Sequence, residues 1–171
     1  MIEFTVQSRL RTWPLPASAI RRAACVLSDC CLPSVTDGEI SISLVSAQKM
    51  AHINELFLGH TGPTDVITFN YGTALDSFST APGGAKSVPS TSMALEIQAE
   101  ILICAEIASK QCRAVGVGWR HEVLRYLVHG FLHLAGHDDQ DPEHRKVMKR
   151  VENRLVRQTA KKLGAPWTLP G

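Results

Sequence analysis

Two histidines four residues apart, His129 and His133, are the side chains in this sequence best suited to bind a metal ion. Four residues turn an α-helix by about 400°, so both imidazoles face the same side and can share one cation. Gly136 follows, and glycine readily adopts the left-handed conformation that ends a helix and reverses the chain. We expect this reversal to bring back a third ligand from the segment His137 to Asp139, and the spacing favours Asp139, with His137 as its competitor.

The pattern predicts one divalent ion held by His129, His133 and Asp139. Three protein ligands and a water are typical of a catalytic zinc, and nickel or manganese would accept the same donors. The plainer alternative is that two buried histidines bond to backbone carbonyls. Helical spacing, a helix breaker and the acidic residues beyond it favour the metal site. Zinc is the expected ion, and we assign no catalytic group beyond the water that it activates.

The same spacing occurs in the HxxxHxxGxxH zinc sites of one class of metalloproteases. Those enzymes carry a Glu directly after the first His as general base, whereas this sequence has Gly130 there. Glycine has no side chain to accept a proton. The neighbouring His121 and Glu122 do not rebuild the motif, because Arg125 stands four residues after His121. An atypical zinc metallopeptidase is therefore kept only as an alternative.

The elements that must position these residues follow from the spacing of apolar residues. Period-two patterns predict strands over 2–6, 40–45, 66–71 and 97–103. Helical patterns cover 17–32, 47–58, 105–116, 119–135 and 142–163, with Ser46 and Asp141 as N-caps. We predict a single α+β domain over 1–171, in which helices pack on a small mixed β-sheet and the metal site lies at the end of a core helix. Residues 72–92 read as a mobile loop and 164–171 as an irregular tail.

Composition limits the remaining possibilities. The chain has 171 residues, 44% of them hydrophobic and 20% charged, which fits one globular domain and excludes wholesale disorder. A net charge of +2 creates no overall field that would indicate a nucleic-acid partner. No apolar run is long enough to span a bilayer, no export signal is visible, and the odd set of five cysteines has no CxxC pair. We expect a cytoplasmic protein with no membrane partner and no dinucleotide cofactor.

The sequence HGFLHLAGHDD, at 129–139, closely resembles the HGxLHLxGYDH signature of the YbeY endoribonucleases, which are bacterial rRNA maturation factors. The similarity extends to Asn54, to GPTDVITF at 62–69, to the strand at 99–103 and to Met148. The resemblance implies the YbeY fold, a zinc-type ion and a metal-dependent, single-strand-specific endoribonuclease. Its expected role is maturation of the 16S rRNA 3′ end and ribosome quality control, with RNA and the small ribosomal subunit as partners.

This sequence departs from the family pattern at three positions. Asp139 aligns with the family's third His, and a carboxylate binds zinc but weakens it as a Lewis acid. Leu58 aligns with an Arg that commonly precedes the PTDV segment, which removes a phosphate-binding cation. Arg125 stands where many members have another His. Either His60 or Arg125 could supply the missing positive charge.

Other polar residues near these motifs have two readings each. Glu122 could carry a proton, support a ligand or lie on the helix surface. Thr64 and Asp65 could shape the cleft or simply cap a turn. A solvated helix face is the default for the basic run, and contact with an RNA backbone is the alternative. That run comprises Arg145, Lys146, Lys149 and Arg150. A ribosome-associated RNA-binding protein with a structural metal is the second alternative function.

Overall fold

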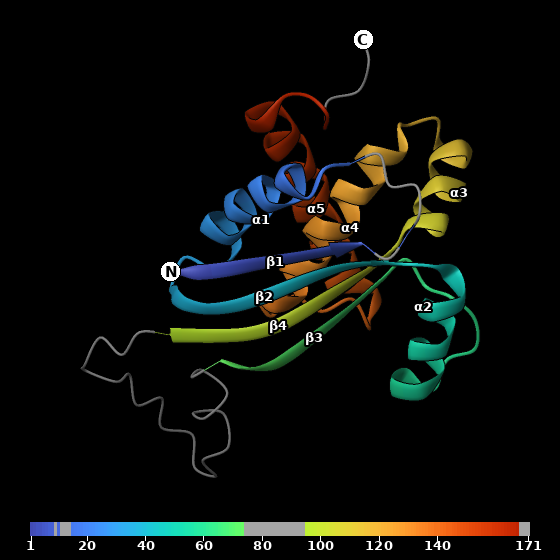
Figure 1. Cartoon of the computed structure of the whole chain (residues 1–171), viewed down its shortest axis with the longest axis horizontal. Coiled ribbons are helices and arrows are strands. Elements are labelled where there is room, and N and C mark those ends of the chain that lie inside the picture. Colours follow the sequence, from blue (N-terminus) through green and yellow to red (C-terminus); the bar gives the residue numbers. More distant parts are fainter. Residues whose placement is uncertain (9, 11–14, 74–94, 168–171) are drawn as a thin grey trace.

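A four-stranded mixed sheet forms the centre of the computed structural model, which describes residues 1–8, 10, 15–73 and 95–167 (Figure 1). The strands lie in the order β1-β2-β4-β3. Their bounds are β1 Ile2–Ser8, β2 Val35–Val45, β3 Val66–Thr73 and β4 Leu95–Cys104. Strands β1, β2 and β4 are parallel, whereas β3 runs antiparallel to β4 at the edge of the sheet.

Helices cover one face of this sheet, and a shorter helix lies beyond one end of the strands (Figure 1). The helices are α1 Ala17–Cys31, α2 Ala47–Ile53, α3 Ala105–Val115, α4 Trp119–Leu134 and α5 Pro142–Leu163. Helix α4 packs between α1, α5 and the sheet. The predicted fold class, a small mixed sheet with packed helices, is thus confirmed. None of the helices in the described part of the chain is both long and apolar enough to cross a membrane.

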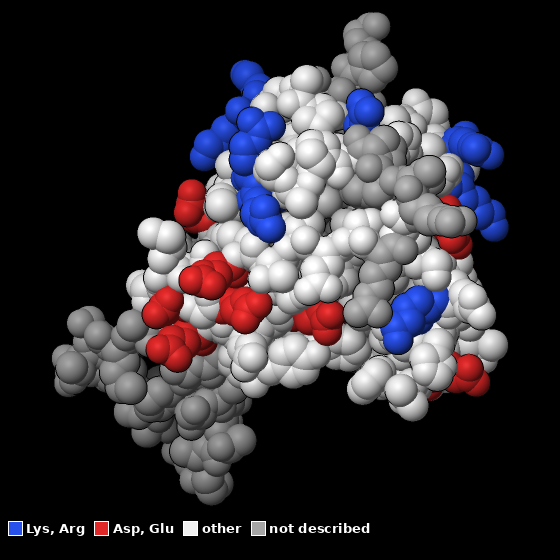
Figure 2. Space-filling model, in the orientation of Figure 1, with Lys and Arg blue, Asp and Glu red and all other residues white. Residues whose placement is uncertain are grey.

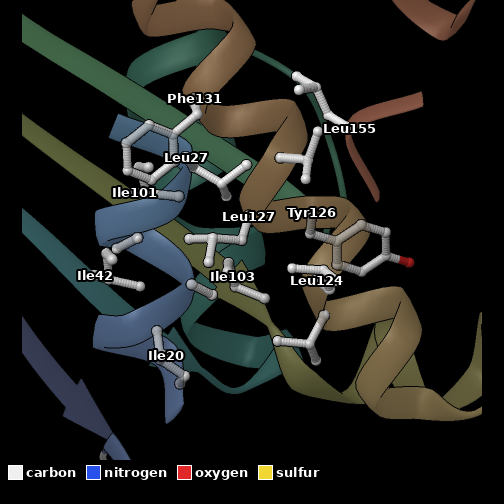
Figure 3. Packing of buried hydrophobic residues seen from close by; sticks show 14 of the residues in the cluster. Ile20, Leu27, Ile42, Ile101, Ile103, Leu124, Tyr126, Leu127, Phe131 and Leu155 are labelled. Carbon is white, nitrogen blue, oxygen red and sulfur yellow. The ribbon is translucent and has the colours of Figure 1, made fainter. Parts of the chain in front are cut away.

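Helix α4 is held by a continuous apolar core. Leu127 and Phe131 have no exposed surface, and they reach from α4 toward Leu27 of α1 and Ile101 of β4 (Figure 3). Burying one such side chain stabilises the fold by about 1.5–3 kcal/mol. The core therefore fixes the helix that carries both histidines. The predicted apolar body of α4 is buried throughout, and it comprises Leu127, Val128, Phe131, Leu132 and Leu134.

Gly130 marks a close approach between α4 and the sheet. A Cβ atom at this position would lie 2.9 Å from Cγ2 of Ile101 and 3.1 Å from Oγ1 of Thr68. Both distances are shorter than ordinary van der Waals contact. The absence of a side chain therefore lets α4 pack directly on β3 and β4, and a glutamate at the protease base position has no room.

The helix ends follow the sequence-based expectations, with one difference. The Oγ of Ser46 accepts from the backbone N–H of Lys49, and Asp141 accepts from Glu143 and His144. The helix predicted over 47–58 is α-helical only to Ile53 and continues as a π-helical turn, η1 Asn54–Leu58. Asn54 is buried there, and its Nδ2 donates to the carbonyl of Gly62 at 2.7 Å. The helical pattern of the sequence did not indicate this hydrogen bond across the turn.

The predicted loop and tail are only partly within the described residues. Gly72 and Thr73 belong to β3, and positions 74–92 of the predicted loop lie outside the described part. In the tail, residues 164–167 form no helix or strand, but Trp167 has no exposed surface and belongs to the core cluster. The sequence indicated only that this tail is irregular, and its contribution to the core is an additional finding. Positions 168–171 lie outside the description.

The close packing at Gly130 leads us to a prediction about the stability of the folded protein. Replacing Gly by Ala inside a helix normally stabilises it by about 1 kcal/mol. We expect Gly130→Ala to lower the free energy of unfolding by about 1–2 kcal/mol, because the added methyl group overpacks the contact with Ile101 and Thr68. Urea unfolding followed by circular dichroism measures the change. A Gly130→Ala variant that is as stable as the wild type, or more stable, would show that the added methyl group fits this contact without strain.

Candidate metal centre

The three predicted ligands converge at the carboxyl end of α4. The Nε2 atoms of His129 and His133 lie 3.0 Å apart. The carboxylate of Asp139 lies 3.7 Å from Nε2 of His129 and 4.0 Å from Nε2 of His133. Among the described residues these three form the group whose donor atoms could hold one metal ion. Each of the three side chains keeps part of its surface exposed, so solvent can reach the site.

The chain reversal after α4 is built by Gly136. Its φ of +84° is in the left-handed region, where a residue with a Cβ is strained. The N–H of Gly136 donates to the carbonyl of His133, and the N–H of His137 donates to that of Leu132, each at 2.9 Å. These two bonds form a Schellman motif, which satisfies the last carbonyls of the helix. The reversal that we expected from the sequence brings Asp139 to the histidines.

The same reversal orients His133. Its Nδ1 lies 3.1 Å from the backbone carbonyl oxygen of His137. A carbonyl oxygen can only accept a hydrogen bond, so Nδ1 must carry the proton and a neutral His133 presents a lone pair on Nε2. His137 therefore contributes its backbone to the site. Its imidazole is not part of the three-residue group found among the described residues.

His129 is oriented by a carboxylate from another helix. Its Nδ1 lies 3.1 Å from Oε2 of Glu152, a residue of α5 that is 4% exposed. Burial raises the pKa of Glu152, but hydrogen bonds from His129, Lys149 and Arg125 outweigh it and lower that pKa to about 2. The ionised carboxylate can only accept. Nδ1 of His129 therefore donates, and its Nε2 also presents a lone pair to the site.

This arrangement fits a bound cation. Two nitrogen lone pairs that face each other at 3.0 Å repel unless a positive charge lies between them. A proton is a poor candidate, because burial and the neighbouring His129 lower the pKa of His133. Two ligands at the usual zinc–nitrogen distance in a tetrahedral site are about 3.3 Å apart. Two imidazole nitrogens and a carboxylate oxygen thus suit zinc, and nickel or manganese as well.

A cavity of about 350 Å³ opens beside this group. Asp65, Tyr126 and three basic residues line it together with two of the predicted ligands, His129 and Asp139. The basic residues are Arg125, Arg145 and Lys149. The α5 basic run was predicted to be a solvated face by default, yet Arg145 and Lys149 face this cavity. Lys146 does not line it and pairs instead with Glu143. Leu58 lies elsewhere, 48% exposed on η1.

The other candidates from the sequence now have definite contacts. Glu122 is 3% exposed and accepts from Nε of Arg125 at 3.4 Å, so it supports that guanidinium instead of lying on the surface. Asp65 accepts from Thr64 Oγ1 and from the N–H of Val66, and it also lines the cavity. His60 is exposed and does not line the cavity.

Glu152 is the site residue that sequence reasoning missed. It lies on the buried stripe of α5, four residues after Met148 and three before Leu155. A carboxylate on the apolar stripe of a helix needs a buried partner. That irregularity in an otherwise apolar pattern was the available signal, although it does not say which partner the carboxylate has.

A larger cavity, of about 680 Å³, is lined by residues of the sheet, of α2 and of η1. Apolar and aromatic side chains dominate its walls, among them Ile53, Phe57, Phe69 and Leu102. The rings of Phe57 and Phe69 meet edge to face, with centroids 5.3 Å apart. None of the histidines of the metal group contributes to this cavity. Of these two cavities, the smaller one therefore combines predicted metal ligands with basic side chains.

The fold and the site define a small α+β protein whose candidate metal centre ends a core helix. Residues 18–160 match the model of the family described as Endoribonuclease YbeY. The chain belongs to this family, and its membership supports an endoribonuclease role.

Individual relatives agree with the family match. An endoribonuclease YbeY of Elusimicrobium minutum is 33% identical over 119 residues, which cover 70% of this chain and 73% of that protein. One of Kineococcus radiotolerans is 29% identical, covering 75% and 68%. One of Corynebacterium efficiens is 33% identical, covering 70% and only 56%. The solution structure of a Thermotoga maritima protein, 22% identical, aligns over 98% of this chain and 95% of its own with a TM-score of 0.58, which shows the shared fold.

The Schellman reversal leads to a paired prediction. Gly136→Ala and Gly116→Ala both place a Cβ at a left-handed helix end, where φ is +84° and +69°, so each should lose about 1–2 kcal/mol of stability. Only Gly136→Ala also disturbs the segment that carries Asp139 and the carbonyl bonded to His133. We expect its zinc affinity, measured by titration calorimetry, to fall about tenfold or more. Equal zinc affinities in the two variants would separate the reversal from ion binding.

Proposed function

We propose that this chain is a metal-dependent endoribonuclease that hydrolyses phosphodiester bonds of single-stranded RNA. One divalent ion, zinc in the first instance, would be held by His129, His133 and Asp139. The observation that carries the proposal is the convergence of these three donors beside a cavity that is lined by His129, Asp139 and three basic side chains. When bound, the ion supplies Lewis-acid stabilisation of charge on the phosphate and lowers the pKa of a water.

The basic residues around the cavity would bind the RNA backbone. Arg145 is anchored, since its Nε donates to the carbonyl of Asp139 at 3.1 Å, and its charge lies beside the proposed ion site. Lys149 is 58% exposed on the same helix, which leaves it accessible to a phosphate. These cations, with Arg125, would take over the role of the family arginine that Leu58 replaces.

Part of the molecular surface carries a charge that disfavours RNA. Figure 2 shows that acidic side chains gather over the strands on the face turned toward the viewer. Exposed acidic residues on those strands include Glu3 and Glu39. Negative charge repels a phosphate backbone. An RNA strand would therefore avoid this acidic part of the surface.

We assign no side chain as general base. Glu122, which the sequence left open as a proton carrier, bonds to Arg125 and does not line the cavity. Glu152 accepts hydrogen bonds from three cationic or ring donors, which leaves it poorly suited to take a proton. Proton transfer from the activated water would then pass to solvent or to the leaving group.

The finer role follows from the family pattern. The signature at 129–139 supports maturation of the 16S rRNA 3′ end and ribosome quality control, with the small ribosomal subunit as partner and the cytoplasm as location. The relatives named above carry the description endoribonuclease. This assignment of a particular RNA is part of the proposal.

Neither alternative function accounts for the site as well. A metallopeptidase would have to use an atypical base, because the usual glutamate position is Gly130, where the contact with Ile101 and Thr68 leaves no room for that side chain. A purely structural metal is normally enclosed by four protein ligands. Here three donors are found together among the described residues, and the side chain of Asp139 is 39% exposed. An open coordination position suits a reacting water.

Loss of one proposed ligand tests catalysis directly. We expect His133→Ala to remain folded and to cut a single-stranded RNA oligonucleotide at least about 100-fold more slowly, because the ion loses a nitrogen ligand. His52→Ala, an exposed helical histidine on α2, serves as the control and should keep full activity. A His133→Ala protein that keeps cutting, or one whose melting temperature collapses first, would indicate a structural metal. Wild-type protein that leaves RNA intact with zinc, nickel and manganese would refute the nuclease assignment.

A charge on α5 tests the RNA path. Arg145→Gln should raise KM for single-stranded RNA several-fold. It should also lower the slope of log KM against log salt concentration by about 0.7, which is the contribution of one phosphate contact. Lys146→Gln removes the same charge one residue away, from a side chain that pairs with Glu143 outside the cavity. It should change KM little. Identical effects of the two substitutions would mean that only net charge matters.

A further inference from the structure

Glu152 combines features that no simple packing role requires. It is 4% exposed on α5, and its carboxylate contacts one residue of the proposed ion site and two cations. We infer that Glu152 is a positioning residue, which holds His129 in the tautomer with the proton on Nδ1 and so directs the Nε2 lone pair at the ion. This inference rests on the proposed function, because it assumes that His129 is a ligand.

The two carboxylate oxygens of Glu152 have separate partners. Oε1 accepts from Nη1 of Arg125 at 2.7 Å and from Nζ of Lys149 at 2.8 Å. Oε2 faces Nδ1 of His129 at 3.1 Å. Arg and Lys can only donate, so the position of Oε1 must be an acceptor. The imidazole of His129 therefore faces Oε2. Because both oxygens of the ionised carboxylate can only accept hydrogen bonds, Nδ1 of His129 must donate as well.

The carboxylate cannot easily turn away from this arrangement. Arg125 is itself held from three sides, since Nη1 also donates to Oδ1 of Asn153 at 2.8 Å and Nε donates to Glu122 at 3.4 Å. Its side chain is 21% exposed, against 5% for that of Glu152. A partly buried guanidinium fixed by three acceptors gives Glu152 a rigid counterpart. The tautomer of His129 is thereby set by a network that spans α4 and α5.

Glutamine at this position would reverse the tautomer. The amide is nearly the same size as the carboxylate, but one of its two polar ends is an NH₂ donor. Arg125 and Lys149 would draw the amide oxygen to the Oε1 position, which leaves the NH₂ group facing His129. Nδ1 of His129 would have to accept, and its proton would move to Nε2. The nitrogen that should bind the ion would then carry a hydrogen.

Nitrogen NMR of the histidine rings tests this directly. In the metal-free protein at a pH where the ring is neutral, two-bond ¹H–¹⁵N spectra should show His129 protonated on Nδ1 in the wild type and on Nε2 in Glu152→Gln. Zinc affinity, measured by calorimetry, should fall about 10–100-fold in this variant, as expected for the loss of a partner behind a ligand. Glu143→Gln is the matched control: Glu143 lies on the same helix and, like Glu152, accepts from a lysine three residues away, but it is exposed and does not contact His129. It should change neither measurement.

Each outcome decides the inference. If wild-type His129 carries its proton on Nε2, or if Glu152→Gln keeps both the Nδ1 proton and the wild-type zinc affinity, Glu152 only packs α5 against α4 and the inference is wrong. The wild-type spectrum gives a decision even if Glu152→Gln fails to fold. The proposed function fails separately, when wild-type protein neither binds a divalent ion nor cuts RNA. In that case the NMR measurement still shows whether Glu152 determines the tautomer of His129.

Discussion

The site depends on two imidazole nitrogens that are held face to face. Nε2 of His129 and Nε2 of His133 lie 3.0 Å apart, and the group behind each ring can only accept a hydrogen bond. Because both rings must donate from Nδ1, both present lone pairs to the same small space. Such an arrangement is unfavourable until a cation occupies it. The surrounding fold must therefore keep two repelling groups together, and that requirement explains much of its construction.

Rigidity comes from the way α4 is packed. Gly130 lets the helix lie directly on β3 and β4, and Leu127 and Phe131 bury its inner face completely. The helix ends in a Schellman motif at Gly136, so the segment after it is fixed to the last turn. Glu152 ties the outer side of the helix to α5. The proposed ion ligands are thus placed by core packing, a helix end and a helix–helix contact, in keeping with the need for preorganised ligands.

Local patterns predicted the parts of this structure that are themselves local. The four-residue spacing of His129 and His133 and the breaker at Gly136 depend only on helix geometry, and the structure has both. Glu152 was missed because its bond to His129 joins residues 23 positions apart on different helices. Trp167 was missed for a similar reason: nothing in a short irregular tail indicates that its ring fills a distant core. Long-range pairings of this kind need the fold.

Two of the three departures from the family pattern, Asp139 and Arg125, change the charge of the same cavity, whereas Leu58 lies elsewhere. Asp139 adds a negative charge to the ligands, while Arg125 adds a positive one within the same cavity. The most direct test of the account is diffraction from zinc-soaked crystals with anomalous data at the zinc edge. We predict an ion bound by Nε2 of His129, Nε2 of His133 and a carboxylate oxygen of Asp139, with a position open to solvent. An ion bound through Nδ1, through His137 in place of Asp139, or at another part of the protein would contradict it.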